Sequence, residues 1–591
     1  MKTKEDPIKD FRNAYNNAIL SQNAFISMNT RKHFKPLNTL VFGVCGSGKG
    51  RFIVKPNILQ MNANYVVTDP ISENLDATGE MLRRNGYNVR VFGTAPSILE
   101  DGRTMKYNPL KYCRDEKSVI SLAEHLLEIW HKEDDRLDPF WEDATKMLLC
   151  SCISLLVLHP QNDERPYAQI PEIIGKETYP VTLFGLLELV RLAEDLKKFG
   201  EIFENIREFE VTGKNEDAVP FCLKSYDAFS LSGAKTLREI VIAAEVALDR
   251  FSIKQLRDLT DTDTIDLDSF GKGRDALFLI SPYDNKTYNF LISLLFEQLW
   301  SHLWDLSDEI HSGKCKKMVL KNGELIRYFP EEAVEKGIED KVQAIRNSRI
   351  KYVSPKNLPE GQDFAEGIYI AADGKGGKIE EPVKIDNGWY EIIDADNEVV
   401  SRRSTREMAE KYLADLKTAE VLAIGDKDSL GHIRFMLDEF PNIAEFPGFK
   451  EKLATMRAID VSATVIYQSV TQLKGQYPDD YEVIDANRPF KIYMGGDEVA
   501  TCEYFAKKIG HRQIPGLNKY SPHSIEFDAR PIMDVDEIRT LPYSKEIICC
   551  HNEKPILDEK FDYQKHKNYR LTRDFAEDCG LREEDTLRFR L

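Results

Sequence analysis

The 591-residue chain has no apolar run long enough to cross a bilayer. Its longest strongly apolar stretch extends from Met147 to Leu158 and already contains two serines. A membrane-spanning helix needs about 20 predominantly apolar residues. The first ten residues are charged and polar, so no secretory signal peptide precedes residue 40. We therefore expect the chain as given to be soluble.

The ten cysteines show none of the spacings typical of metal sites. Cys150 and Cys152 lie in an apolar stretch predicted to be helical, and Cys549 and Cys550 are adjacent in another apolar run. This pattern indicates reduced thiols in a cytosolic compartment. Cys45 lies inside a glycine-rich loop, where it is either an oxidation-sensitive thiol or a small residue at a variable position.

The chain also lacks a compact basic stripe, and its formal net charge is −18. The short clusters at 31–32 and 314–317 are typical of solvated faces. This charge argues against a surface that coats nucleic acid, but it permits a local basic channel. The composition, with 42% hydrophobic and 30% charged residues, is that of a globular protein with room for two to four domains.

Residues 43–49, GVCGSGK, match the phosphate-binding loop G-x-x-x-x-G-K-[S/T] up to its last position. Glycines let successive backbone N–H groups surround the phosphates of a nucleotide, and the lysine reaches the same oxygens. The hydroxyl at the last position normally helps to hold Mg²⁺, but a glycine stands there in this chain. The predicted nucleotide-binding residues are Gly43, Gly46, Ser47, Gly48, Lys49, Gly50 and Arg51.

The loop alone is a weak signal, because a bare G-x-x-x-x-G-K should occur by chance in about one chain in six of this length. The flanking residues strengthen the prediction. Residues 38–42 form a short apolar run typical of a buried strand, and residues 51–54 begin a helix whose N-terminus would face the phosphates. Pro56 should kink or end that helix early.

Alternating strands and helices predict an α/β domain with a parallel sheet covered on both faces. Further strands are expected at 65–69, 87–92, 276–280, 434–439, 461–467 and 490–494. Helices with apolar residues at spacings of three and four are expected at 73–85, 118–130, 140–158, 183–199, 237–251 and 288–306. Asp69 ends one strand at the edge where such sheets bind ligands.

These patterns divide the chain into five parts. The parts are a lead-in at 1–35, a nucleotide-binding domain at 36–114, 266–310 and 428–570, an all-α domain at 115–265, an α+β insert at 311–427, and a charged tail at 571–591. The insert has no catalytic signature, and it either binds a partner or is inert. The tail should be a solvated terminus.

A second motif, Phe435 to Leu437 followed by Asp438 and Glu439, is typical of a Walker B strand. Such a strand delivers an acid to the sheet edge beside the phosphate loop. Asp438 would hold Mg²⁺ directly or through water. Glu439 would orient and deprotonate the attacking water. Buried strands that end in solvated acids are common, so the motif depends on its pairing with the phosphate loop.

Two further residues fit a nucleotide hydrolase. Gln468 ends the next predicted strand, where its amide can sense the terminal phosphate. Arg457 lies 19 residues after Asp438 on a predicted helix. It either acts as an arginine finger in a neighbouring subunit's site or forms a surface salt bridge.

Several segments, in this order, resemble the type IV secretion coupling proteins, the TraG/VirD-type conjugative DNA-transfer ATPases. They are NTLVFGVCGSGKGRFIVKPN (38–57), YVVTDPISE (65–73), YNPL (107–110), DPFWEDATKMLL (138–149) and FMLDEFPNIAEFPGFKEKLATMRAIDVSATVIYQSVTQL (435–473). The resemblance covers most of 30–305 and 430–570 and leaves the insert outside. The last segment separates this family from generic P-loop proteins and from FtsK/HerA-type chromosome motors.

The resemblance implies a RecA-like P-loop NTPase motor domain that carries an all-α domain. It implies a homohexamer that uses ATP and Mg²⁺ to export relaxase-bound single-stranded DNA, or protein substrates, through a type IV secretion channel. Carried over by motif, Lys49 binds phosphate, Asp438 and Glu439 form Walker B, Arg457 is the trans-acting arginine, and Gln468 is the sensor. The expected location is cytoplasmic, at the inner face of the bacterial cell membrane.

The sequence departs from the family pattern in three places. Gly50 replaces the usual Thr or Ser, and Ile71-Ser72 stands where many relatives have Lys-Gly. The membrane anchor that usually precedes the motor is missing, which indicates an anchorless subgroup, a truncated chain, or membrane association through partners. A water can replace the hydroxyl on Mg²⁺, so we expect weak or slow ATP hydrolysis. The alternative function is a nucleotide-binding docking adaptor for secretion substrates with little turnover.

Overall fold

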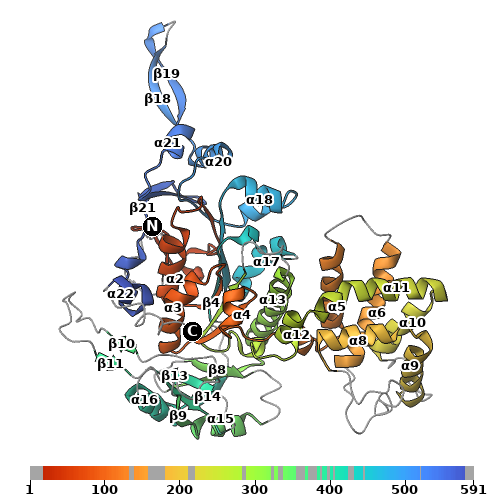
Figure 1. Cartoon of the computed structure of the whole chain (residues 1–591). Coiled ribbons are helices and arrows are strands. Elements are labelled where there is room, and N and C mark those ends of the chain that lie inside the picture. The colour runs from red at the N-terminus through yellow and green to blue at the C-terminus, as the bar shows by residue number, and fades with distance from the viewer. Residues whose placement is uncertain are drawn as a thin grey trace. The chain divides into compact units, whose positions relative to one another are not determined.

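The computed structural model describes residues 17–131, 139–157, 180–210, 220–281, 288–320, 325–329, 337–353, 367–369, 383–385, 389–395, 399–403, 406–423, 431–442, 446, 448–518 and 521–578. The chain divides into two compact units (Figure 1). Unit 1 comprises Met1–Thr104, Leu267–Asn289 and Trp300–Leu591, and unit 2 comprises Met105–Asp266 and Phe290–Leu299. None of the helices in the described ranges is long and apolar enough to cross a membrane.

Within its described part, unit 1 is built on a nine-stranded sheet in the order β21-β20-β17-β3-β16-β15-β4-β6-β5. The strands are β3 (Thr39–Phe42), β4 (Asn64–Thr68), β5 (Asn88–Gly93), β6 (Asp275–Ile280), β15 (Ile433–Leu437), β16 (Val461–Tyr467), β17 (Phe490–Tyr493), β20 (Lys545–Cys550) and β21 (Ile556–Glu559). From β17 to β5 the neighbours are parallel, whereas β20 and β21 add antiparallel pairings. The predicted α/β class is therefore confirmed.

The central strands are mainly apolar and are buried along their whole length, because both faces of the sheet are covered. Every residue of β3, β4, β6, β15, β16 and β17 is buried. Parallel strands buried on both faces are typically continuous apolar runs. This is why these strands were predictable from sequence. The edge strand β21 alternates half-buried and exposed positions, and the sequence did not predict it.

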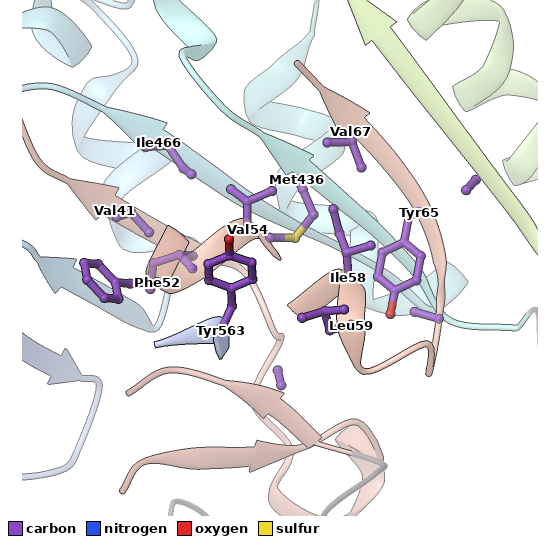
Figure 2. Packing of buried hydrophobic residues seen from close by; sticks show 14 of the residues in the cluster. Val41, Phe52, Val54, Ile58, Leu59, Tyr65, Val67, Met436, Ile466 and Tyr563 are labelled. Carbon is purple, nitrogen blue, oxygen red and sulfur yellow. The ribbon is translucent and has the colours of Figure 1, made fainter. Parts of the chain in front are cut away.

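One face of this sheet is covered by the segment that follows β3. It forms η1 (Gly50–Val54), a single wide π turn, and then α2 (Lys55–Leu59). Figure 2 shows its apolar side chains against those of the central strands. The labelled contacts are Phe52, Val54, Ile58 and Leu59 against Val41, Tyr65, Val67, Met436, Ile466 and Tyr563. Each such fully buried aliphatic side chain contributes about 1.5–3 kcal/mol.

The helix does not end at Pro56, although an irregular π turn directly precedes α2. Pro56 lies in the first turn of α2, where a missing backbone N–H is tolerated, and the helix continues to Leu59. The π turn before it closes with a bond from Lys55 N to Gly50 O. The preceding wide turn and the first-turn position together accommodate the proline.

Outside residues 312–430, nine further described α-helices lie wholly within unit 1. They are α1 (Thr30–His33), α3 (Glu73–Arg84), α4 (Pro96–Glu100), α17 (Phe449–Thr455), α18 (Val470–Gln476), α19 (Tyr481–Ala486), α20 (Val499–Ile509), α21 (Val535–Arg539) and α22 (Arg573–Asp578). The long helix α13 (Asn289–His311) has residues assigned to both units. Two antiparallel pairs complete this part: β1 (Asn17–Ile19) with β2 (Phe25–Ser27), and β18 (His511–Asn518) with β19 (Ser521–Pro531).

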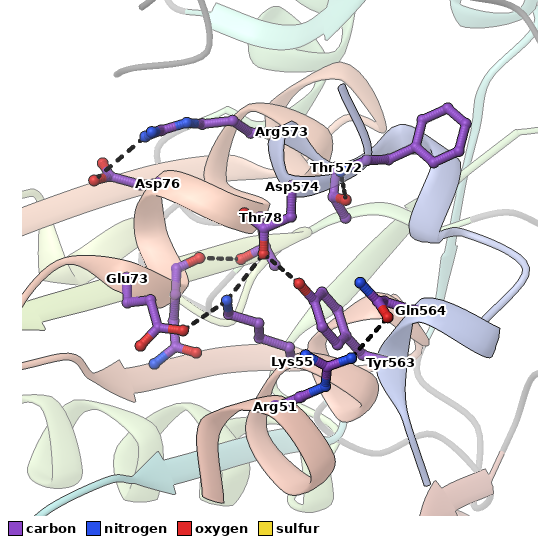
Figure 3. Close-up of polar contacts among 12 residues, drawn as sticks. Arg51, Lys55, Glu73, Asp76, Thr78, Tyr563, Gln564, Thr572, Arg573 and Asp574 are labelled. Carbon is purple, nitrogen blue, oxygen red and sulfur yellow. Dashed lines mark hydrogen bonds and ion pairs between the residues drawn. The ribbon is translucent and has the colours of Figure 1, made fainter. Parts of the chain in front are cut away.

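The C-terminal segment packs onto α2 and α3 through charged groups (Figure 3). The Lys55 ammonium, buried at its tip, lies 2.8 Å from Glu73 and 2.9 Å from Asp574. Tyr563 donates a hydrogen bond of 2.7 Å to the same Asp574 carboxylate. The expectation of a solvated tail from residue 571 therefore fails for α22, because a buried cation needs paired acids. Residues 579–591 lie outside the described part.

Between α13 and β15, the described residues form two small three-stranded sheets and two helices. The sheets are β14 (Glu420–Ala423), β7 (Lys316–Val319) and β8 (Leu325–Phe329), and β13 (Val399–Arg403), β12 (Trp389–Ile393) and β9 (Arg349–Val353). The helices are α15 (Ile338–Arg346) and α16 (Arg406–Leu416). Between them in the sequence, β10 (Gly367–Tyr369) and β11 (Val383–Ile385) form a two-stranded antiparallel sheet. Met318, Ile345, Ile392 and Leu416 belong to an apolar cluster of this region alone.

Unit 2 is helical throughout its described residues. Its helices are α5 (Glu116–His131), α6 (Pro139–Val157), α8 (Leu183–Leu192), α9 (Leu196–Glu210), α10 (Phe221–Ser230), α11 (Ala234–Leu248) and α12 (Lys254–Thr260). The apolar α6 packs against α5, α8, α10 and α11 (Figure 1). The single helix expected at 183–199 is two helices, because Asp195 accepts from Lys198 N and starts a new one.

Stability should depend on pH through His566, which joins the C-terminal segment to α2. Its Nδ1 accepts from Asn568 N at 3.1 Å, and its Nε2 donates to Gln60 Oε1 at 3.2 Å. Burial lowers the pKa of His566 to about 4. The unfolded chain, with a pKa near 6.5, therefore binds the proton first as pH falls, and about 2 kcal/mol of stability is lost by about pH 5.

Urea unfolding at about pH 7.5 and pH 5 would measure this loss in the wild type and in His566→Gln, which cannot titrate. We expect the wild type to lose about 2 kcal/mol more than the variant. Equal losses in the two proteins would contradict the assignment.

Candidate functional site

The phosphate loop joins β3 to η1 at the carboxyl edge of the parallel sheet. Gly43 N donates to Tyr467 O at 3.0 Å, and Ser47 N donates to Val44 O at 3.1 Å, which fixes the loop at its base. Gly48 has a φ of +84°, and a Cβ there would lie 2.4 Å from the Phe52 ring. Gly46 has a φ of +80° and open space around its Cβ position. The loop therefore has the backbone that a phosphate-binding nest needs.

Lys49 is bound within its own loop and to the Walker B segment. Its Nζ donates to Gly43 O at 3.0 Å and lies 2.9 Å from Glu439 Oε1. The two side chains are only 7% and 9% exposed. The ammonium and the carboxylate therefore neutralise each other in a dry environment, where an unpaired charge is costly.

Glu439 also contacts the predicted sensor. Gln468 Nε2 donates to Glu439 Oε2 at 3.0 Å. Glu439 has left-handed backbone, with a φ of +49°, which is uncommon outside glycine and clusters at functional sites. The structure thus brings Lys49, Glu439 and Gln468 together, from three neighbouring strand ends.

Asp438 lies beside this group, at the end of β15. Its Oδ1 accepts from Glu439 N at 3.0 Å, and its carbonyl accepts from Thr68 Oγ1 at 2.8 Å. Burial, reinforced by the Glu439 charge, raises the pKa of Asp438 to about 7. Asp69, at the end of the adjacent β4, is also buried, and this raises its pKa to about 7. Both carboxyls are therefore partly protonated near neutral pH, and a cation beside them would favour their ionised forms.

The residues fit Mg²⁺ that arrives with a nucleotide. Within the described ranges, no group of three or more His, Cys, Asp or Glu is placed to hold a metal ion alone. Magnesium typically uses one or two carboxylates, substrate phosphates and several waters. Asp438 can supply the carboxylate, and the loop can supply the phosphate-binding N–H groups.

Gly50 is the first residue of η1, and the loop has no side-chain oxygen at this position. The Ser47 hydroxyl is buried and packs against Gly43, where an added Cβ would be 2.4 Å away. Arg51 turns to the C-terminal segment, where its Nε and Nη2 bind the two Asp562 oxygens at 3.2 and 2.8 Å. Figure 3 shows its further hydrogen bond to Gln564. Only the backbone of Arg51 is therefore available to a phosphate.

Arg457 is not brought to this cluster within the described structure. It lies on the short 3-10 helix η9 (Met456–Ile459) rather than on an α-helix. Its Nη1 donates to Phe34 O at 2.9 Å, and its guanidinium lies 5.9 Å from the Phe34 ring. Phe34 is itself exposed, so this arginine is on the surface of unit 1.

The motif analysis missed two residues beside the loop. Lys560, just after β21, donates to Ser47 O at 3.1 Å and to Met494 O at 2.8 Å. Burial lowers the pKa of Lys560 to about 8. Asn74, on α3, lies near Gly50. Neither belongs to a motif, so only the tertiary structure reveals them.

The comparisons with known proteins decide the family. The model described as "Type IV secretory system Conjugative DNA transfer" matches residues 8–321, more than half of the chain. The chain belongs to this family. A second model, "TraM recognition site of TraD and TraG", matches residues 432–543. The predicted relationship to the type IV secretion coupling proteins is confirmed.

Solved structures show the same fold at low identity. The bacterial conjugative coupling protein TrwB, in a trigonal form with sulphate, has 12% identity and a TM-score of 0.50 over 92% of this chain and 89% of that chain. Its unbound monoclinic form gives the same identity and TM-score over 92% and 88%. The complex of TrwB with ADP and Mg²⁺ gives 0.48. No curated protein matches the chain. The predicted fold class is confirmed.

The buried Lys49–Glu439 pair should be detectable in the free energy of unfolding. Lys49→Ala leaves a buried carboxylate without its cation, so we expect a loss of about 3 kcal/mol. Adding Glu439→Gln removes the orphaned charge and should recover part of this loss. A double-mutant cycle by urea unfolding without nucleotide should give a coupling of about 1–3 kcal/mol.

Arg539→Ala is the matched control, because Arg539 pairs with Asp536 in the open, with side chains 49% and 83% exposed. Its effect should stay within about 0.5 kcal/mol. Additive losses for Lys49→Ala and Glu439→Gln would show that the pair contributes nothing.

Proposed function

We propose that the chain is an ATPase that recruits relaxase-bound single-stranded DNA, or a protein substrate, and drives it into a type IV secretion channel during conjugation. The contact of Lys49 with Glu439, and of Glu439 with Gln468, carries this proposal. Hydrolysis needs a phosphate-binding group, a water-activating group and a sensing group at one point. Here the Lys49 ammonium lies 2.9 Å from the Glu439 carboxylate, and the Gln468 amide donates to that carboxylate at 3.0 Å. Family membership supplies the conjugative setting.

The proposed mechanism begins with Lys49 leaving Glu439 and the carbonyls of its loop for the terminal phosphate. ATP with Mg²⁺ supplies the phosphoryl group and the charge that stabilises its transfer. The loop N–H groups and Lys49 orient the phosphates, and Asp438 would hold the cation. Glu439, no longer paired with Lys49, accepts the proton of the attacking water. Gln468 keeps the Glu439 carboxylate in place through its amide.

This exchange of partners couples binding to activation. While Lys49 is paired with Glu439, the ammonium lies against the carboxylate oxygen that would take a proton from water. A bound phosphate competes for the same ammonium and so frees the base.

We propose a homohexamer in which Arg457 completes the neighbouring copy's site. Its exposed position on η9, held by Phe34 and away from its own Glu439, suits a group that acts on another copy. An arginine supplied in trans stabilises the charge of phosphoryl transfer. Proposed partners are the relaxosome and channel subunits at the inner face of the cell membrane, and the match at residues 432–543 supports a relaxosome contact.

The second candidate is a docking adaptor that binds nucleotide and cargo but scarcely hydrolyses ATP. Gly50 favours it, because the residue that usually helps to hold Mg²⁺ has no side chain here. The intact group of Lys49, Asp438, Glu439 and Gln468 favours the motor.

ATP turnover by the purified chain, with and without single-stranded DNA, separates these candidates. We expect DNA-stimulated turnover that Lys49→Ala and Glu439→Gln each reduce by at least about 100-fold, because phosphate binding and water activation are lost. Arg539→Ala should keep wild-type turnover. Nucleotide binding without turnover above the two inactive variants, under conditions where the chain assembles, would instead establish the adaptor.

Mixing variants tests the role of Arg457. Arg457→Ala alone should be inactive, as should Lys49→Ala alone. In a random mixed ring, about one quarter of the interfaces combine an intact loop with an intact arginine from the neighbour. The mixture should therefore regain turnover above either variant. Inactivity of the mixture, with confirmed co-assembly, would place Arg457 in its own subunit's site or in folding.

A further inference from the structure

The space beside Gly50 contains an oxygen atom from another element. A Cβ added to Gly50 would have one heavy atom within 4 Å outside its own chain neighbours and helix backbone, Asn74 Oδ1 at 3.9 Å. A threonine or serine at position 50 would carry its hydroxyl one bond beyond that Cβ. The Asn74 oxygen therefore lies in the neighbourhood that the family hydroxyl would occupy.

Asn74 is buried and its amide is held in one orientation. It lies in the first turn of α3 and is 3% exposed. Its Nδ2 donates to Asp69 Oδ1 at 3.3 Å, which turns the oxygen the other way. That oxygen has no hydrogen-bond partner. A buried polar atom left unsatisfied costs about 1–3 kcal/mol, so its retention needs an explanation.

Asp69 positions this asparagine. One Asp69 oxygen accepts from Asn74 Nδ2, and the other accepts from Leu75 N at 2.7 Å. The first turn of α3 is thus tied to the end of β4, the strand beside β15. Because Asp438 follows β15, the Asn74 oxygen and the Asp438 carboxylate belong to the same edge of the sheet.

We propose that Asn74 Oδ1 takes the place of the hydroxyl missing at Gly50 and binds Mg²⁺ that accompanies the nucleotide, either directly or through one of its waters. Amide oxygens are hard ligands of the kind that Mg²⁺ accepts. An amide is neutral, as a hydroxyl is, so the exchange leaves the charge of the site unchanged. This inference rests on the proposed nucleotide site and assigns one of its metal contacts.

The test measures metal-dependent nucleotide binding rather than turnover. The affinity of the fluorescent analogue mant-ADP would be determined by anisotropy, with Mg²⁺ and with EDTA. The proteins are the wild type, Asn74→Ala, Gly50→Thr and the double variant. Asn85→Ala, after the last residue of the same helix, is the control. Electron paramagnetic resonance of Mn²⁺ with ADP reports the metal directly.

We expect Mg²⁺ to tighten mant-ADP binding in the wild type and in Asn85→Ala. In Asn74→Ala, the ratio of mant-ADP affinity with Mg²⁺ to that with EDTA should be at least about tenfold smaller than in the wild type, while the affinity in EDTA is unchanged. Gly50→Thr should restore the tightening in the Asn74→Ala background, because the Cβ position of residue 50 is open. In the wild-type background the same substitution should change little.

An unchanged Mg²⁺ effect in Asn74→Ala, or an equal weakening with Mg²⁺ and with EDTA, would overturn the inference. If Asn74→Ala does not fold, Asn74→Leu removes the oxygen at similar volume and the same criteria apply. Failure of the wild type to bind mant-ADP under either condition would overturn the nucleotide site itself. Tight binding with no Asn74 effect would overturn only the metal contact.

Discussion

The ion pair between Lys49 and Glu439 depends on strand order, and the rest of the site is arranged around it. Strand β16 separates β3 from β15, so the loop after β3 and the acids after β15 lie on either side of Gln468. Burial makes this pair unfavourable unless its remaining polar atoms are satisfied. The carbonyl of Gly43 and the amide of Gln468 satisfy them.

The same physical reason explains which parts of the fold were predictable. A strand buried on both faces, such as β16, is mainly apolar and rich in β-branched residues, so its sequence alone identifies it. The alternating β21 and the antiparallel β18–β19 pair lack that signal. The acids of α22 were expected to be solvated because their partners, including Lys55, lie hundreds of positions away in the sequence. Sequence reasoning detects local patterns, and these errors concern contacts between distant segments.

In the site, too, residues in local motifs were predicted, whereas contacts between distant segments were not. Lys49, Asp438 and Glu439 belong to motifs whose chemistry fixes both residue type and spacing, and Gln468 follows from its place at a strand end. Asp69 was noticed for the same reason, although its role in holding α3 was not foreseen. The side-chain direction of Arg51 depends on Asp562, and no local pattern reports that pairing.

The position of Asn74 changes what the glycine at residue 50 implies. A hydroxyl on the phosphate loop moves with the loop, whereas an amide on α3 is tied to Asp69 and β4. Metal binding through that amide would therefore link the phosphate loop to α3, an element that the usual hydroxyl does not involve. Ser72, directly before α3, has left-handed backbone with a φ of +58°, so the turn that delivers Asn74 is itself strained. Strain is retained where a function depends on it. A metal contact at Asn74 is a function that accounts for both the strained turn and the unsatisfied oxygen.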